Sequence, residues 1–421
     1  MRMSQPAARW EQILDTSPGD PAVRGREDRH VPASRRSSAA RLILASVTSA
    51  AAMLGLAALP ARAAIPAARA APAAQAAPAA RAAPAARPAA AAAPVIIRGL
   101  DLHDGMILRH ADVFYLYGTR YGCGFEWTVR NTPFCGFGVA TASRLPGPWT
   151  FRRLLFSPRA LDNWGPDRGR TWNWVCGVSG DGCFNPRMVE RPDGVWLLWF
   201  NAPRDSFAYH APAYYVMGCA GPLGPCGYQD GGPHGSTHKP SLKFCNADGD
   251  FSIITSGASA AIICSRYTLA EEQLDHWWTD GTGRGATGLG GVPAPAAVSA
   301  AQAQTAAIGE GVGGYQVSAG EWEMTYSAPA CGYCTGPPRL LAAQGSVKEV
   351  RTEYSTAPSM LGPWTAQGAL SAAYCAGQPR TVFTLPGQGA WEWVDRWTGS
   401  RNERGAAIAL EPMAASPWSC S

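Results

Sequence analysis

The stretch Leu102–Thr119, LHDGMILRHADVFYLYGT, predicts how this chain folds. An apolar segment that starts after Asp104 leads into a polar turn at Arg109–Asp112, and an aromatic segment then ends at Gly118. Two apolar segments joined by a short polar turn are typical of a β-hairpin. The same pattern returns along the chain, with a different polar residue in the place of Asp104.

Five such strand–turn–strand units follow one another after Val95, and they begin near residues 104, 185, 239, 310 and 378. In the third unit we expect a first strand at Lys239–Phe244, a turn at Asp248–Asp250 and a second strand at Phe251–Thr255. Several units end in a turn containing Gly and Pro. Regular repetition of short β-units predicts an all-β fold, a five-bladed β-propeller. The alternative is a β-sandwich of unrelated hairpins.

In a propeller the innermost strand of every blade starts at the central axis. The polar residues that begin the five units should therefore meet in one pocket. These residues are Asp104, Asn185 or Arg187, Lys239, Glu310 and Gln378.

The first part of the 421-residue chain has the composition of a targeting segment. Residues 1–63 contain Arg35–Arg36, then an apolar run from Leu42, then Ala61–Ala63, and this order is typical of a secretory signal peptide. A transmembrane anchor is the alternative, but the apolar run is short and rich in alanine. Residues 64–94 repeat Ala, Pro and Arg and should form a semi-stiff linker. Residues 95–421 are expected to form the propeller.

All twelve cysteines follow the linker. An even number of cysteines behind a signal peptide indicates disulfides in an extracellular protein. Spacing does not fix the connectivity, and the nearest-neighbour hypothesis pairs Cys123 with Cys135, Cys176 with Cys183, Cys219 with Cys226, Cys245 with Cys264, Cys331 with Cys334, and Cys375 with Cys420. A redox pair or half of a zinc site is the alternative for Cys331 and Cys334.

The net charge of +5 derives partly from arginines in the head and linker, so it does not indicate nucleic-acid binding. We expect a monomer without a stable membrane anchor.

The motifs of the repeat resemble glycoside hydrolase family 43, over about Val95 to Met413. His103–Ile107 resembles the family's His-Asp-Pro-x-Ile opening, and Glu310–Gly313 resembles its Glu-Gly-Pro phrase. Gln378–Thr381, together with Asp395–Trp397, is similar to the closing blade of the exo-galactanase-like branch. The resemblance implies a five-bladed propeller in which Asp104 is the general base, Glu310 is the general acid and Gln378 lines the active site.

One motif departs from the family. Where the family has an aspartate in Ile-Asp-Pro-Ser-Leu, which tunes the pKa of the acid, this chain has Lys239 in the segment His238–Leu242. A neighbouring ammonium group would lower the pKa of Glu310, whereas a general acid has to stay protonated. Either Lys239 points elsewhere, or the chemistry differs from that of the family, or activity is lost.

Other residues are candidates for substrate contact. Lys239 is a candidate partner for an acidic sugar, and His103 and His238 for a hydroxyl group or a metal ion. Gln378 and Arg187 start predicted inner strands. For each of these the alternative is a structural role. Among sixteen tryptophans, most of them expected in the core, those between the predicted strands are candidates for sugar stacking: Trp127, Trp172, Trp174, Trp277 and Trp278. We expect no required cofactor, and the sequence leaves a central structural ion undetermined.

The sequence thus predicts a secreted glycosidase that acts on arabinose-, xylose- or galactose-containing saccharides. An inverting mechanism needs two carboxyl groups roughly 6.5–9.5 Å apart, a role for Asp104 and Glu310. The alternatives are a catalytically inactive carbohydrate-binding propeller that uses the same pocket, and an adhesion domain on an Ala/Pro stalk.

Overall fold

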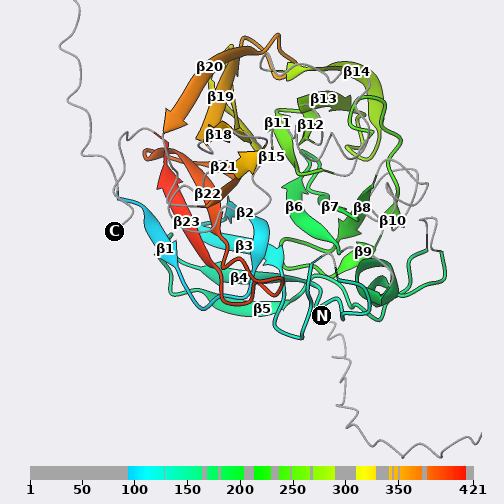
Figure 1. Ribbon diagram of the computed structural model, residues 1–421. Helices are drawn as coiled ribbons and strands as arrows, with labels where there is room; N and C mark the ends of the chain where they lie inside the picture. The colour runs from blue at the N-terminus through cyan, green and yellow to red at the C-terminus, as the bar shows by residue number, and fades with distance from the viewer. Residues whose placement is uncertain are drawn as a thin grey trace, which may run out of the picture. The chain divides into compact units, whose positions relative to one another are not determined.

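The computed structural model describes residues 93–413, except for residues 128, 164–167, 179–181, 203–212, 229–236, 247–248, 266–268, 290–309, 329–340, 344–345, 349–350 and 372–376. The predicted signal peptide and most of the linker lie outside this part. Five sheets surround a common axis, each with its first strand innermost (Figure 1). The predicted all-β, five-bladed propeller is confirmed, and the β-sandwich alternative is wrong.

The blades are built in chain order. The first blade contains β2 (His103–His110), β3 (Val113–Thr119), β4 (Phe137–Ala142) and β5 (Thr150–Leu154). A π-helix, η1 (Trp174–Val178), lies between the first and second blades in the sequence. The second blade contains β6 (Phe184–Glu190), β7 (Trp196–Asn201) and β8 (Tyr214–Cys219), and two short strands pair with β8, namely β9 (Cys226–Tyr228) and β10 (Thr237–His238).

The remaining blades follow the same order. The third contains β11 (Phe251–Ser256), β12 (Ser259–Ser265), β13 (Leu269–Leu274) and β14 (Gly281–Thr287). The fourth contains β15 (Glu310–Ser318), β16 (Glu321–Ala328), β19 (Arg351–Ala357) and β20 (Thr365–Ser371), with the separate hairpin β17 (Leu341–Ala343) and β18 (Ser346–Lys348) inserted in its sequence. The fifth contains β21 (Gln378–Leu385), β22 (Gly389–Arg396) and β23 (Ala407–Pro412).

The circle is closed by the strand β1 (Val95–Ile97), which adds to the outer edge of the fifth blade. Val95 pairs with Leu410 and Ile97 pairs with Ile408. This pairing satisfies an edge that would otherwise be open, and it joins the two ends of the propeller sequence.

The third blade corrects the sequence prediction. Its inner strand is β11, which contacts β6 and β15, and not Lys239–Phe244. In the predicted segment the backbone N–H groups of Lys243 and Phe244 donate to the Glu272 carboxylate, at 2.7 and 2.8 Å. Because these donors are used by a side chain, the segment bends instead of joining the sheet ladder.

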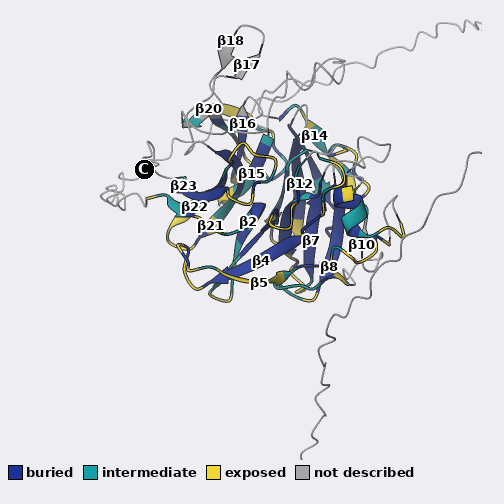
Figure 2. Ribbon diagram, turned by 60° about the horizontal axis from the view of Figure 1, so that its bottom comes forward, coloured by how far each residue is buried: buried dark blue, intermediate teal, exposed yellow. Residues whose placement is uncertain are grey.

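Buried side chains between neighbouring sheets hold the blades together. Figure 2 shows that most strands of the blades carry the colour of buried residues. Phe137, Phe156, Phe200 and Tyr215 pack around Trp172, with the Trp172 ring centroid 5.1 Å from that of Tyr215. Each such edge-to-face contact contributes about 0.5–1.5 kcal/mol beyond area burial. Trp172 and Trp278 are each only 2% exposed, so both belong to the core, and the expectation that they contact sugar is wrong.

Four predicted disulfides are confirmed: Cys123–Cys135, Cys176–Cys183, Cys219–Cys226 and Cys245–Cys264. The other two predicted pairs, Cys331–Cys334 and Cys375–Cys420, lie outside the described residues. Within the described segments, no helix has the length and apolar character needed to span a membrane.

The inner strands are tied together at the axis by Arg187 of β6, which is 2% exposed. Its Nη1 donates to the carbonyl oxygens of Asp104 and Gly105, at 2.7 and 2.8 Å, and its Nε donates to that of Phe251 at 3.0 Å. One guanidinium thus satisfies carbonyl groups of the first and third blades. Because these donors are used by backbone, the hypothesis that Arg187 binds substrate is corrected to a structural role.

Candidate functional site

Three carboxyl groups come together where the inner strands begin. Asp104 lies in the start of β2, Asp250 immediately precedes β11, and Glu310 opens β15. These strands belong to the first, third and fourth blades and surround the axis in Figure 1. The structure therefore brings together the predicted pair, Asp104 and Glu310, with a third carboxylate, Asp250, for which the sequence pattern predicts a place in a turn.

The backbone at these strand starts is irregular in a repeated way. Asp104 and Asn185 have φ angles of 60° and 57°, and Gly311 has a φ of 65°. Each lies at a break in the pairing register of β2, β6 or β15. Such bulges re-aim side chains next to a site, and Asp, Asn and Gly tolerate the left-handed backbone best. Glu310 precedes its left-handed residue by one position, so by register it matches His103 and not Asp104.

The carboxylates are joined by a buried arginine of the fifth blade. Arg380 lies on β21 and is 5% exposed. Its Nη2 is 2.8 Å from Oδ1 of Asp104, and its Nη1 is 2.7 Å from Oδ2 of Asp250. Its Nε is 3.4 Å from Oδ2 of Asp395. One guanidinium therefore contacts three carboxylates. Arg380 belongs to the Gln378–Thr381 motif, but nothing in that motif by itself indicates these partners.

Gln378, at the start of the same strand, is placed beside Glu310. Its Nε2 donates to Oε2 of Glu310 at 3.0 Å, and its Oε1 accepts from Nε1 of Trp397 at 2.8 Å. Because the indole N–H can only donate, it fixes the amide with its NH2 group toward Glu310. Gln378 thus lies where the sequence placed it.

Asp250, and not Lys239, lies beside Asp104 and Glu310, where the family has its third carboxylate. The predicted replacement of that carboxylate by lysine is therefore wrong. Asp250 accepts from Nδ2 of Asn185 and from the N–H of Gly311, both at 2.9 Å. The Nζ of Lys239 instead lies 4.6 Å from the centre of the Tyr215 ring. A sequence signal existed, because Asp250 precedes the apolar run of β11 as Asp104 precedes that of β2.

The other predicted contact residues are distributed around this centre. His103 is fully buried, with Nδ1 3.6 Å from Oδ1 of Asp395, between the rings of Tyr121 and Trp397. Trp127 packs on the cluster that contains Tyr121, and Trp174 packs against the core between the first two blades. The side chain of His238 lies outside the described residues.

Burial and charge push the acidities of the three carboxyl groups apart. Burial and, after it, the charge of Asp250 together raise the pKa of Glu310 to about 7, although the charge of Arg380 opposes the change. Burial also raises the pKa of Asp104 to about 6, again against the charge of Arg380. For Asp250 the effect of burial is outweighed by Arg380 and by the hydrogen bonds from Asn185 and Gly311, so its pKa is lowered. Asp250 is therefore the permanent negative charge of the group.

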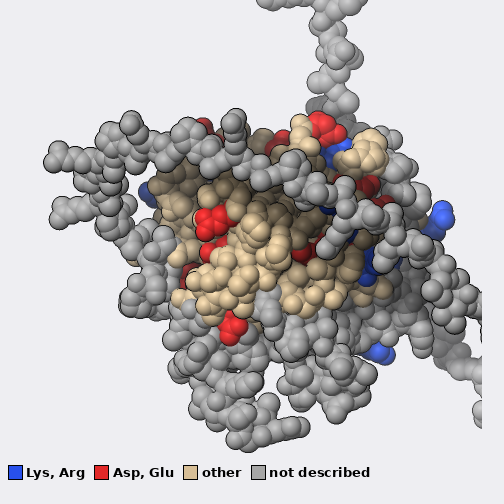
Figure 3. Space-filling model, turned by 90° about the horizontal axis from the view of Figure 1, so that it is seen from above, with Lys and Arg blue, Asp and Glu red and all other residues tan. Residues whose placement is uncertain are grey.

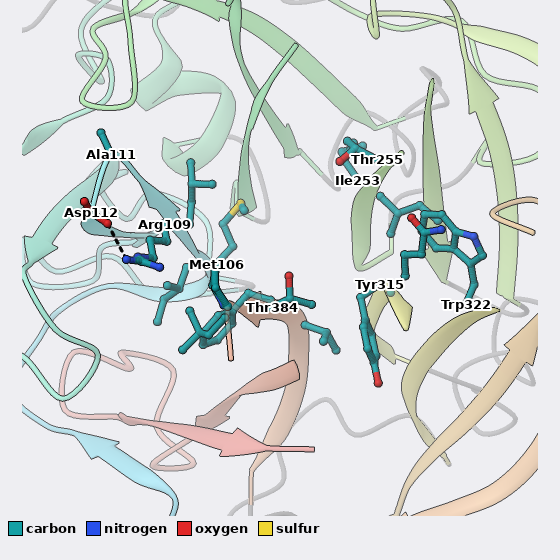
Figure 4. A pocket seen from close by; sticks show the side chains of 18 residues that line it. Met106, Arg109, Ala111, Asp112, Ile253, Thr255, Tyr315, Trp322 and Thr384 are labelled. Atoms are coloured by element: carbon teal, nitrogen blue, oxygen red, sulfur yellow. Dashed lines mark hydrogen bonds and ion pairs between the residues drawn. The ribbon is translucent and has the colours of Figure 1, made fainter. Parts of the chain in front are cut away.

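A separate cavity lies at the opposite ends of the inner strands (Figure 4). It has a volume of about 850 Å³ and is lined mainly by residues 106–109, 253–255, 314–316 and 382–386. None of the three carboxyl groups lines it. In Figure 3 acidic and basic side chains are interspersed with uncharged ones on the described surface. Within the described ranges, no group of three or more His, Cys, Asp or Glu side chains is arranged to hold a metal ion.

No protein-family model matches this chain, and no curated protein matches its sequence. Solved structures do match its fold. A family 43 β-1,3-galactosidase has 14% identity and a TM-score of 0.52, over 74% of this chain and 56% of that chain. An exo-β-1,3-galactanase from Phanerochaete chrysosporium with β-1,3-galactotriose has 17% identity and a TM-score of 0.52, over 74% and 60%.

A second family 43 β-1,3-galactosidase, with galactodeoxynojirimycin, has 15% identity and a TM-score of 0.50, over 74% of this chain and 90% of that chain. This chain has the fold of glycoside hydrolase family 43. At these identities the likeness concerns the fold, and the chain spans less than two thirds of the first two structures. The family 43 propeller predicted from the motifs is confirmed at this level.

Removing the charge of Arg380 should destabilise the protein in a pH-dependent way. In Arg380→Met, Asp104 and Asp250 lose their buried counter-charge, so the already raised pKa of Asp104 should rise further and that of Asp250 should rise above its value in the unfolded chain. Stability should then fall as the pH rises, because the folded state has to ionise buried carboxyl groups. We expect a loss of about 3–5 kcal/mol at pH 8 and a smaller loss at pH 4.5, measured by urea unfolding.

Arg109→Met is the matched control, because Arg109 is part-exposed and pairs with the exposed Asp112 at the far end of β2. It should cost no more than about 1 kcal/mol at either pH. An equal loss at pH 4.5 and pH 8 in Arg380→Met would contradict the electrostatic role.

Proposed function

We propose that this protein is a glycoside hydrolase in which Asp104 is the general base and Glu310 is the general acid. The observation that carries the proposal is the pair of buried carboxyl groups with raised pKa values beside a third carboxylate with a lowered one. Carboxyl groups whose environments separate their acidities are the signature of acid–base catalysis. The family 43 fold supports the same proposal.

The proposed reaction follows from these acidities. Protonated Glu310 gives its proton to the glycosidic oxygen as the bond to the anomeric carbon breaks. Ionised Asp104 takes a proton from a water molecule, whose oxygen forms the new bond on the opposite face of the sugar and inverts the anomeric centre. Asp250 keeps Glu310 protonated in the free site, and Gln378 orients its carboxyl group.

The alternative is an inactive carbohydrate-binding propeller. It follows from the prediction that Lys239 replaces the carboxylate that tunes the pKa of the general acid. Asp250 supplies that carboxylate, so this reason no longer applies. A binding module has no need for a buried carboxyl group that is half-protonated near neutral pH, because carrying it reduces stability. The catalytic proposal therefore accounts for more of the site.

We further propose a galactoside as the first substrate to test, because the three compared structures carry names of β-1,3-galactosidases or a β-1,3-galactanase. Arabinosides and xylosides complete the panel. The proposed setting is extracellular, which the four disulfides support. We propose a monomer that needs no cofactor for the proton transfers, with Trp127, Trp174, His238 and Lys239 as candidates for substrate contact. His103 is fully buried, so we propose a structural role for it.

Wild-type protein should hydrolyse at least one member of a panel of 4-nitrophenyl galactosides, arabinofuranosides and xylosides and the matching disaccharides. Asp104→Asn should lose about 10²–10⁴-fold in kcat on both kinds of substrate. Glu310→Gln should lose a similar factor on the disaccharide and less on the nitrophenyl glycoside, because that leaving group needs little protonation.

The matched controls are Asp112→Asn and Glu321→Gln, which alter exposed carboxylates in the same two blades. Both should keep wild-type turnover. If the wild type binds sugar but hydrolyses no member of the panel, the catalytic proposal is wrong and the inactive carbohydrate-binding propeller is supported.

The first-formed product should have the inverted anomeric configuration. A water molecule between the two carboxyl groups attacks the face opposite the leaving group. Proton NMR of the anomeric signal in the first minutes of hydrolysis measures this directly. Retention of configuration would contradict Asp104 as a base.

The pH profile of kcat/KM should be bell-shaped with a narrow optimum. Activity should fall below about pH 6, where Asp104 becomes protonated, and above about pH 7, where Glu310 becomes ionised. In Asp250→Asn the negative charge that raises the pKa of Glu310 is gone, so the basic limb should move to lower pH. An unchanged basic limb in this variant would argue against the tuning role of Asp250.

A further inference from the structure

Besides Arg380, the fifth blade supplies a carboxylate, that of Asp395, which contacts the backbone of Asp104. Asp395 lies on β22 and is fully buried. Its Oδ2 accepts from the backbone N–H of Asp104 at 2.8 Å, and its Oδ1 accepts from Nε1 of Trp393 at 3.0 Å. Asp395 and Asp104 are far apart in sequence but adjacent across the junction of the first and fifth blades.

This contact acts where the chain is strained. Asp104 has a φ of 60°, and such a backbone costs of order 1–3 kcal/mol for a residue other than glycine. It persists only where the surroundings hold it. The hydrogen bond from Asp395 fixes the N–H of the strained residue, and the direction of the Asp104 side chain depends on that backbone.

Tyr121, in the segment after β3, holds Asp104 on its other carboxylate oxygen. Its hydroxyl donates to Oδ2 of Asp104 at 3.1 Å. The backbone of Tyr121 is anchored in turn, because its N–H donates to Oδ1 of Asp101 at 2.8 Å and its carbonyl accepts from Nδ2 of Asn402 at 2.9 Å. The hydroxyl is therefore delivered to Asp104 from a fixed loop.

We propose that Asp395 and Tyr121 are positioning residues that hold Asp104 from two sides, Asp395 at its backbone N–H and Tyr121 at its carboxylate, and set the pH range in which it accepts a proton. The inference rests on the proposed function, since it gives Asp104 the role of base. Neither residue reacts itself, because each acts through Asp104.

The two residues act on the acidity of Asp104 in opposite directions. The negative charge of Asp395 raises the pKa of Asp104. A hydroxyl that donates to the carboxylate favours the ionised form, so Tyr121 lowers it. Loss of one or the other should therefore move the titration of Asp104 with opposite sign, a result that a general loss of structure does not produce.

Further charged or titratable groups face Asp104 and Asp395. Arg380 faces both carboxylates, Asp250 faces Arg380, and His103 lies 3.6 Å from Asp395. Arg187 contacts the carbonyl of Asp104. Among these, Arg380 and His103 lower the pKa of Asp104, and Asp250 raises it.

The test compares Asp395→Asn and Tyr121→Phe with wild type in the pH profile of kcat/KM. In Asp395→Asn the acidic limb should move down by about one pH unit. Its kcat should fall by about 10²-fold with KM nearly unchanged, because a small displacement of the base misaligns the attacking water. In Tyr121→Phe the acidic limb should move up. Asp112→Asn, the same substitution at an exposed site in the first blade, should leave the limb in place.

A second measurement makes the result independent of turnover. The 13C chemical shift of the Asp104 carboxyl, assigned with Asp104→Asn, gives its titration midpoint in each variant. A lower midpoint in Asp395→Asn and a higher one in Tyr121→Phe support the proposal, even if wild type hydrolyses nothing and the proposed function fails. Midpoints that stay at the wild-type value, or move together, would overturn it. If Asp395→Asn does not fold, the direction of the Tyr121→Phe shift decides.

Discussion

The site depends on one buried guanidinium. Arg380 contacts Asp104 and Asp250 and approaches Asp395, so it balances negative charge contributed by the first, third and fifth blades. Buried carboxylates without a counter-charge would stay protonated or destabilise the fold. With Arg380 in place, Asp250 stays ionised while Asp104 and Glu310 titrate closer to neutral pH. The division of roles among the three carboxyl groups follows from burial, which raises the pKa values of Asp104 and Glu310, and from Arg380 together with the hydrogen bonds from Asn185 and Gly311, which keep Asp250 ionised.

A second arginine keeps the frame in which these groups meet. Arg187 satisfies carbonyl oxygens of β2 and of the start of β11, so the inner strands of three blades share one cation at the axis. The repeated left-handed residues Asp104, Asn185 and Gly311 turn the strand starts at the same level. At Asp104 and Asn185, which carry a Cβ, this backbone has a cost, and long-range hydrogen bonds with other blades offset it. The junction between the first and fifth blades, where Asp395 meets Asp104, combines both effects.

The local sequence determined the units of the fold. Alternating apolar segments and polar turns give hairpins such as β2–β3, and their repetition gives the blades. The four disulfides seen in the structure join cysteines that are close in sequence, so nearest-neighbour pairing was sufficient. Asp104, Glu310 and Gln378 were found because each marks the start of a strand, where a period-two pattern begins.

Only the tertiary structure decided the partners of these residues. Arg380 and Asp104 are 276 residues apart, and Asp395 and Asp104 are 291 apart, so no local pattern connects them. Lys239 matches a family motif in the sequence and Asp250 does not. In the structure, however, the backbone N–H groups of Lys243 and Phe244 donate to the Glu272 carboxylate, and β11 is the inner strand of the third blade. Which segment forms the inner strand of the third blade therefore depends on a contact with Glu272 of β13 that no local pattern reveals. Sequence alone therefore determined the blades and the candidate acid and base, while long-range electrostatics decided how those groups are held and charged.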